Sequence, residues 1–343
     1  MYLNLLPIKL EIASPREEYD IYQGLVAEKG ENSLPAINQL IYVALSAIRA
    51  QLVNPDYFDR DIEGLRFDKQ IKVRKIIDDF VKSRRFEAIE ECVRNGCSEC
   101  DGYHSVCDYA LMSIKSRIND DIEERLINIS IDLINNCYGL NSPQSAELSF
   151  NLGYSFYLKE RYCLMLDIDK NYSTAEFYAK KSYDIYKFCF GDTSFVSNRS
   201  LFLLVNIYNA KFDLDSQKKC IDMMFDSYKK DPLSVDGMSD LIFDFLQGLF
   251  LKALSRSSSN RHAHFVKFFE SWNLDDLNMS YMNLFILKYY YADSLYHVGK
   301  FEKFKKYLKD TELSLGQYEL HGINLEHFKS IQDRVRQHLQ NIE

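Results

Sequence analysis

Apolar side chains recur at three- and four-residue steps along most of the chain, and the alternation typical of strands is almost absent. Residues 37–52 (INQLIYVALSAIRAQL) predict an apolar helix that is buried on more than one side. The segment 71–95 predicts two shorter helices that stop at Gly96, since glycine commonly follows the last helical residue. Segments 105–118 and 121–139 predict a further pair. The pattern therefore favours an all-α fold.

A final helix is predicted at about 322–341, where an apolar stripe faces a polar one. Its apolar positions are Leu325, Phe328, Ile331, Val335 and Leu339, and its polar positions are Lys329, Asp333, Arg336 and Gln340. A helix that is buried on one side and hydrated on the other is typical of the closing element of a helical array.

Two segments that begin at residues 135 and 187 are similar to each other, at an offset of 52 residues. Each continues with an aromatic residue and glycine, a short polar turn and a helix. The corresponding residues are Tyr138-Gly139 and Phe190-Gly191 at the turns, and Leu148, Leu152, Phe156 and Ser200, Leu204, Tyr208 in the helices. Without an insertion of ten residues at 163–172 the offset becomes 42, which suits a helix–turn–helix unit.

These units resemble the tetratricopeptide repeat, in the longer form found in kinesin light chain. The matching residues are Asn151-Leu152-Gly153 with Phe156, less closely Leu203-Leu204-Val205 with Tyr208, and the small residues Ala175 and Ala179 of the following helix. A third copy near the C-terminus places Ala292 at the small position, Gly299 in the turn and Phe301 at the start of the second helix. The resemblance covers 120–230 and 284–314. The sequence departs from the family pattern at the insertion of ten residues and at Gln217, where a small residue is expected.

The resemblance implies a right-handed superhelical solenoid of tetratricopeptide-like helix–turn–helix repeats. We expect repeats over 66–320, an N-terminal helical segment (a cap or small bundle) over 1–65, and a capping helix over 321–343. In the family, the first helix of each repeat lines a concave groove that holds a segment of another protein. The corresponding residues here are Asn151, Tyr154, Tyr157, Arg199, Asn206, Asn209, Tyr289, Tyr290, Asp293 and Tyr296. Asparagine can both donate to and accept from a peptide backbone, and tyrosine offers a large rigid contact.

The favoured function is therefore a non-enzymatic scaffold or adaptor that binds a protein or peptide in this groove. One alternative is a peptide-sensing regulatory switch, in which residues 1–65 form the output bundle. Another is a helical ribonuclease similar to the HEPN type, whose Arg and His would be Arg256 and His262. Self-association through an open end of the array is a further possibility, because such ends expose apolar helix faces.

Composition and charge limit the classes of binding partner and the cellular compartment that are expected for the protein. The formal net charge of −8 counts against general binding of nucleic acid, which needs a basic surface. A basic segment at 66–85 is expected to be a solvated helix face, with an anionic partner as the alternative. No run of 18 apolar residues predicts a membrane span, and MYLNLLPIKLEIA lacks the features of a signal peptide. The eight cysteines are then expected to be reduced thiols in a cytoplasmic protein.

One cluster has the composition of a zinc site. Cys97, Cys100, His104 and Cys107 fall within eleven positions and could supply four tetrahedral ligands. The alternative is a turn between helices with unpaired thiols, and we favour it because a long repeated core does not need a metal for stability. We expect no cofactor. The common phosphate-binding, zinc-protease and nucleophile-elbow motifs are also absent from the sequence, which favours a non-enzymatic role.

Overall fold

The computed structural model describes residues 14–31, 33–53, 59–96, 103–116, 120–161, 171–235, 237–255, 259–277, 279–310 and 325–341. These ranges contain fifteen α-helices and two short 3-10 helices, and no strand, so the predicted all-α class is confirmed for them. The chain divides into two compact units, an N-terminal unit (residues 1–220) and a C-terminal unit (residues 221–343). Each unit is described separately below.

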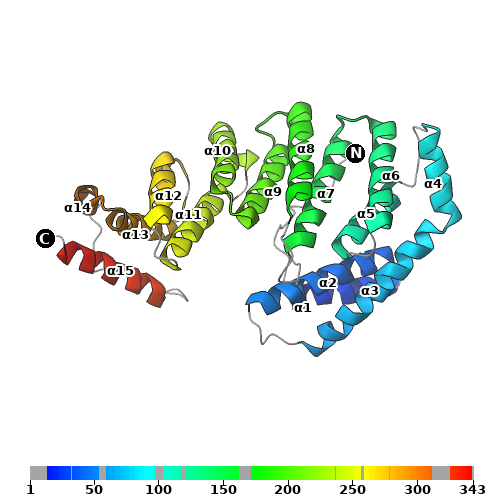
Figure 1. Ribbon diagram of the computed structural model, residues 1–343, viewed down its shortest axis with the longest axis horizontal. Helices are drawn as coiled ribbons and strands as arrows, with labels where there is room; N and C mark the ends of the chain where they lie inside the picture. The colour runs from blue at the N-terminus through cyan, green and yellow to red at the C-terminus, as the bar shows by residue number, and fades with distance from the viewer. Residues whose placement is uncertain are drawn as a thin grey trace. The chain divides into compact units, whose positions relative to one another are not determined.

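The N-terminal unit is a succession of helices, most of which pack on their neighbours in sequence, while α4 packs on α3 and α6 (Figure 1). The helices are α1 (Pro15–Lys29), α2 (Leu34–Val53), α3 (Arg60–Val81), α4 (Arg84–Arg94), α5 (Tyr103–Ser116), α6 (Asp120–Tyr138), α7 (Pro143–Arg161), α8 (Ser173–Phe190), α9 (Phe195–Lys211) and α10 (Leu214–Lys230), the last of which crosses the division. Alternate helices also touch: α3 contacts α5, α5 contacts α7, and α7 contacts α9. These four odd-numbered helices therefore share one layer, which we call the odd-helix layer.

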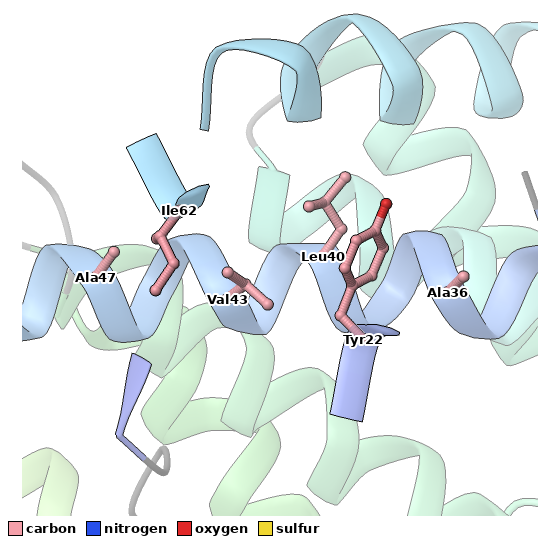
Figure 2. Close-up of a cluster of buried hydrophobic side chains, with 6 residues drawn as sticks. All are labelled: Tyr22, Ala36, Leu40, Val43, Ala47 and Ile62. Carbon is pink, nitrogen blue, oxygen red and sulfur yellow. The ribbon is translucent and has the colours of Figure 1, made fainter. Parts of the chain in front are cut away.

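The first three helices share an apolar core (Figure 2). Tyr22 of α1 and Ile62 of α3 pack against α2, and the cluster is completed by Ala36, Leu40, Val43 and Ala47 of α2. Helix α2 also contacts α5, where Lys115 donates to the Asn38 amide oxygen and to the Tyr42 hydroxyl, each at 3.2 Å. Helices α1–α3 therefore pack onto the rest of the N-terminal unit through α5.

Helices α7 and α8 approach each other closely at Gly153. A Cβ atom at this position would lie 3.0 Å from the backbone nitrogen of Ala179 and 3.2 Å from the carbonyl oxygen of Ala175. Neither backbone atom can move away independently of its helix, so the contact requires a residue without a side chain. The small residues that suggested a repeat in the sequence thus have a packing role at a helix pair.

The two aromatic-glycine turns have the same geometry. Gly139 and Gly191 both have φ of 87°, and their N–H groups donate at 2.9 Å to the carbonyls of Asn135 and Lys187 respectively. Each glycine follows the last residue of a helix, α6 or α8. The internal similarity at an offset of 52 residues therefore corresponds to a repeated local structure.

The C-terminal unit is centred on α13. Its elements after α10 are a 3-10 turn at Pro232–Ser234, α11 (Met238–Ser255), α12 (Ser259–Ser271), a 3-10 turn at Leu274–Asp276, α13 (Tyr281–His297), α14 (Phe301–Asp310) and α15 (Leu325–Gln340). Helix α13 contacts α11, α12, α14 and α15. The predicted turn is present: Gly299 has φ of 74°, and α14 begins at Phe301.

Most predicted helices occur within a few residues of their predicted bounds. The main difference is α3, which begins at Arg60 and continues across residue 65. Helix α1 was not predicted from periodicity, although its start is marked: the Ser14 hydroxyl accepts from the N–H of Glu17 at 3.3 Å, and the Glu17 carboxylate accepts from the N–H of Ser14 at 2.9 Å. This capping box, with Pro15 at the first helical position, is the feature of the sequence from which the start of α1 could have been predicted. The insertion at 163–172 falls almost entirely outside the described residues. None of the described helices is long and apolar enough to cross a membrane.

Candidate functional site

The first part of the predicted groove lies where α7, α8 and α9 meet, and Glu147 of α7 is its centre. The carboxylate accepts hydrogen bonds from the Tyr186 hydroxyl, from the Asn151 amide at 3.3 Å, and from the Arg199 guanidinium at 3.2 and 3.4 Å. Burial, and next the adjacent Glu147 carboxylate, raise the pKa of Tyr186. Glu147 and Arg199 stand at the same offset of 52 residues as the two turns, so they occupy equivalent positions on α7 and α9. Glu147 was not among the residues predicted from the sequence, although its offset of 52 residues from Arg199 was a signal that could have identified it.

The residues of the N-terminal unit that were predicted to line the groove fall into two groups. Tyr154 and Tyr157 are buried, with 8% and 3% of their surface exposed, whereas Asn151, Asn206 and Asn209 are half-exposed. Buried tyrosines cannot contact a ligand in this conformation, so the asparagines are the accessible members of the predicted set.

Phe202 extends the half-exposed surface of α9, and the Arg199 side chain lies largely buried at its edge. The Arg199 guanidinium lies 3.9 Å from the centroid of the Phe150 ring, and only 10% of the Arg199 side chain is exposed. Phe202 is half-exposed one helical turn later, and its carbonyl accepts a hydrogen bond from the Asn206 amide at 2.9 Å. Arg199, Phe202, Asn206 and Asn209 therefore stand at three- and four-residue steps along one face of α9.

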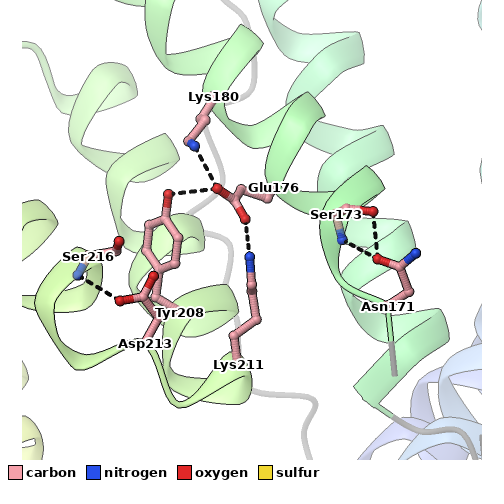
Figure 3. A network of polar contacts seen from close by, with 8 residues as sticks. All are labelled: Asn171, Ser173, Glu176, Lys180, Tyr208, Lys211, Asp213 and Ser216. Carbon is pink, nitrogen blue, oxygen red and sulfur yellow. Dashed lines mark hydrogen bonds and ion pairs between the residues drawn. The ribbon is translucent and has the colours of Figure 1, made fainter. Parts of the chain in front are cut away.

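A second acidic centre joins α8 to α9 (Figure 3). The Glu176 carboxylate accepts hydrogen bonds from Lys180 at 2.6 Å, from the Tyr208 hydroxyl at 3.1 Å, and from Lys211. Burial opposes ionisation of Glu176, but the hydrogen bonds from Lys180, Lys211 and Tyr208 outweigh it and lower its pKa to about 2. Burial and the neighbouring carboxylate raise the pKa of Tyr208 to about 12. Both oxygens of this acid have partners, which is typical of a structural link between helices.

The residues of the C-terminal unit that were predicted to line the groove lie on α13 and face its helical neighbours. Tyr289, Tyr290 and Asp293 are buried, with at most 2% of their surface exposed. The ring of Tyr290 stacks on Phe250 at a centroid distance of 3.9 Å, and Tyr296, which is half-buried, stacks on His338 of α15 at 3.7 Å. These aromatic side chains pack between helices, so only Tyr296 is partly accessible.

Asp293 is surrounded by basic side chains. Its Oδ1 lies 3.2 Å from His338 Nε2 and 3.5 Å from Arg334 Nε, and its Oδ2 lies 3.6 Å from His297 Nε2. His262 of α12 stacks on His297 at a centroid distance of 4.5 Å. Burial, together with repulsion from His297, lowers the pKa of His262 to about 4 although Asp293 acts in the opposite direction. The imidazole of His262 is therefore neutral at pH 7.

The other sequence candidates are only partly described. Cys97 and Cys100 lie outside the described residues, as does the side chain of His104, so the structure does not place the cysteine cluster. Burial raises the pKa of Cys107 to about 12, and its thiol is protonated at neutral pH. Arg256, the partner that the ribonuclease hypothesis requires, also lies outside the described residues.

The basic segment 66–85 is not uniformly solvated. Lys69 is buried, and Lys72 pairs with Glu31. Charge neutralisation of this kind leaves less of the segment available to an anionic partner.

Comparison of the chain with protein-family models, with curated proteins and with solved structures found no match. The candidate sites therefore depend on the geometry described above, and the tetratricopeptide resemblance stays a prediction.

Proposed function

We propose that the chain is a non-enzymatic scaffold or adaptor that binds a segment of another protein on the odd-helix layer of the N-terminal unit. In this proposal α5–α10 are tetratricopeptide-like pairs of a right-handed superhelical array. The close α7–α8 contact at Gly153 and the equivalent turns at Gly139 and Gly191 support it. The contacts between alternate helices support it as well, because in stacked helix pairs the first helices lie side by side.

The observation that carries the proposal is the half-exposed face of α9, formed by Phe202, Asn206 and Asn209, with the largely buried Arg199 side chain at its edge. It combines amides that donate and accept with one aromatic edge, and the Arg199 guanidinium, which is held by Glu147 and the Phe150 ring, supports these groups from below. Asn151 extends the face onto α7, next to Glu147. The buried tyrosines of α7 would support this surface from below rather than contact the partner.

The test is binding by the purified full chain to peptides selected from a random displayed library. Fluorescence anisotropy would compare the wild type with an Asn151→Ala/Asn206→Ala variant. We expect the variant to bind at least about tenfold more weakly, a loss of about 1.4 kcal/mol. The matched control is Asn128→Ala/Asn136→Ala, which makes the same chemical change at two exposed positions of α6. The control should bind like the wild type.

Equal affinities for the wild type and the Asn151→Ala/Asn206→Ala variant would reject this surface. A regulatory switch with a separate N-terminal bundle is less well supported, because α2 packs on α5 through Lys115. The ribonuclease hypothesis is also less well supported, since His262 is buried with 2% of its surface exposed. A buried imidazole cannot reach the phosphate of an RNA backbone in this conformation.

A further inference from the structure

The C-terminal unit brings two histidines and an aspartate together at the junction of α12 and α13. His262, Asp293 and His297 each offer one ligand atom, and these atoms all lie within 4.8 Å of one another. Asp293 and His297 are four residues apart and so project from the same face of α13, while His262 comes from α12. The group is independent of the surface proposed above for peptide binding, which lies on α7 and α9.

A buried oxygen without a hydrogen bond points to a missing ligand. The Asp293 side chain is fully buried, and its Oδ2 accepts no hydrogen bond from the described residues. Leaving a buried acceptor without a partner costs about 1–3 kcal/mol, and more when the group is charged. A positively charged group bound at Oδ2 would remove this cost.

We propose that His262, Asp293 and His297 bind a divalent transition-metal ion of the zinc class. Two imidazole nitrogens and one carboxylate oxygen suit zinc, cobalt or nickel, whereas magnesium and calcium prefer ligand sets made of oxygen alone. Three protein ligands leave a fourth coordination position. Water can fill it, or the His338 imidazole can reach it after a small movement.

The distances require only local adjustment. In a tetrahedral zinc site with bonds of about 2.0–2.1 Å, the ligand atoms lie about 3.3 Å apart. The separation of 3.6 Å between His297 Nε2 and Asp293 Oδ2 is already close to this value. His297 is the ligand with room to move, because 38% of its side chain is exposed. Rotation of this ring changes only the separations that involve His297, and any closing of the separation between His262 and Asp293, which is at most 4.8 Å, requires a movement of one of these buried side chains.

In two of the three ligands, the polar atom that would not bind the ion already contacts another residue. The Ser294 hydroxyl lies 3.0 Å from His262 Nδ1, which leaves Nε2 for the ion. His338 and Arg334 hold Asp293 Oδ1, which leaves Oδ2. Outer contacts of this kind fix the orientation of metal ligands.

The experiment measures binding of Zn²⁺ and Co²⁺ to the purified full chain after treatment with a chelator. We expect one equivalent of either ion to bind, with a Co²⁺ visible spectrum typical of nitrogen and oxygen ligands, and Ca²⁺ and Mg²⁺ to bind much more weakly. His297→Asn should lower the affinity more than about 100-fold, since loss of an outer partner alone costs about 10–100-fold. The matched control is His264→Asn on the same helix as His262, which should bind like the wild type, because the His264 side chain instead contacts the Asn260 carbonyl.

Ser294→Ala serves as a second variant that leaves all three ligands in place, and we expect a loss of about 10–100-fold in affinity. A Cys97→Ser/Cys100→Ser variant tests the competing site, and it should bind Co²⁺ like the wild type. A thiolate-to-cobalt charge-transfer band that disappears in the cysteine variant would overturn the proposal, because the ion would then belong to the cysteine cluster. Absence of binding, or equal loss in His297→Asn and His264→Asn, would also overturn it. These outcomes are distinct from failure of the peptide-binding proposal, whose variants lie on α7 and α9.

Discussion

Each of the two units places a carboxylate between neighbouring helices, but the two carboxylates differ in how completely they are satisfied. Glu176 of the N-terminal unit keeps 16% of its side chain exposed and has partners at both oxygens. Asp293 of the C-terminal unit is fully buried, and two basic groups compete for its Oδ1 while Oδ2 has no hydrogen bond from the described residues. The Glu176 junction is therefore complete within the protein, whereas the Asp293 junction leaves one buried oxygen that the proposed metal ion would bind.

The difference has an energetic consequence. An exposed ion pair contributes about 0–1 kcal/mol, because water already solvates both charges. Removing the charge of one partner in a buried cluster costs far more, since the other charges stay buried without compensation. The two junctions should consequently respond very differently to the same chemical change, from carboxylate to amide.

The largest effect is expected for Asp293→Asn. With the metal removed by a chelator, the variant leaves Arg334 without its anionic partner, and we expect the free energy of unfolding to fall by about 3 kcal/mol. Urea denaturation measures the loss, and amide hydrogen exchange of α13 locates it. The control is Asp333→Asn in the exposed pair with Arg336, where both side chains are at least 43% exposed and the change should be under about 0.5 kcal/mol. A loss no larger than that of the control would show that the burial of Asp293 has no special consequence.

The next effect is expected for Gly153→Ala, which tests whether backbone packing rather than the polar contacts holds the N-terminal junction. The new Cβ would lie 3.0 Å from a backbone nitrogen of α8. Overpacking against atoms that cannot yield costs about 3 kcal/mol, of which about 1 kcal/mol is offset by the higher helix propensity of alanine. We expect a net loss of about 2 kcal/mol by urea denaturation.

Gly24→Ala is the matched control, because Gly24 is also inside a helix and has no atom within 4 Å of its virtual Cβ. Here only the propensity acts, so we expect a gain of about 0.5–1 kcal/mol. If both alanines stabilised the protein, the close contact between α7 and α8 would not be a constraint on the sequence.

Local features of the fold were predictable because they depend on short-range chemistry. Helical periodicity predicted the all-α class, and glycine at the turns predicted the ends of α6, α8 and α13. The small residues Gly153, Ala175 and Ala179 stood out in the sequence as matches to the repeat, and the structure shows that they permit the close approach of α7 and α8. Repetition in the sequence made the turns visible, since the same glycine requirement occurs at Gly139 and Gly191.

The site was less predictable, because it depends on which helices meet. The sequence places Asp293 on the inner side of a repeat, but only the contact between α13 and α15 brings His338 and Arg334 to it. The three ligand candidates come from α12 and α13, and the segment between His262 and Asp293 does not resemble a metal-binding motif. Burial of Tyr154 and Tyr157 likewise follows from packing of α7 against α5 and α8, which periodicity cannot specify.

A smaller effect is expected for Glu176→Gln, the counterpart of Asp293→Asn in the N-terminal unit. We expect a loss of about 1 kcal/mol at pH 7, reduced by solvent because Lys180 is 55% exposed. The pKa of Glu176 falls from its ordinary value of 4.5 to about 2 on folding, so its contribution is present above pH 4.5 and disappears as the pH falls toward 2. Urea denaturation of the wild type and the variant at several pH values measures this. The difference between them should shrink in this window; a difference that stayed constant would mean that the Glu176 charge does not stabilise the junction.

The smallest effect concerns the helix ends after α9 and α13, which have the same hydrogen bonds but different residues. Phe212 and Gly299 donate to the carbonyls three residues earlier, and Asp213 and Lys300 to those five residues earlier. Both Phe212 and Gly299 are in the left-handed region, with φ of 58° and 74°. This conformation costs a residue with a Cβ about 1–2 kcal/mol, and glycine nothing comparable.

Phe212→Gly should therefore raise the free energy of unfolding by about 0.5 kcal/mol, since relief of backbone strain exceeds the entropy that glycine loses on folding. The reciprocal change, Gly299→Ala, should lower it by about 1 kcal/mol. Urea denaturation of the two variants and the wild type measures both signs in one experiment. Destabilisation by Phe212→Gly would mean that the contacts of the Phe212 ring outweigh its backbone strain, and the two helix ends would then be equivalent in hydrogen bonding but not in energetics.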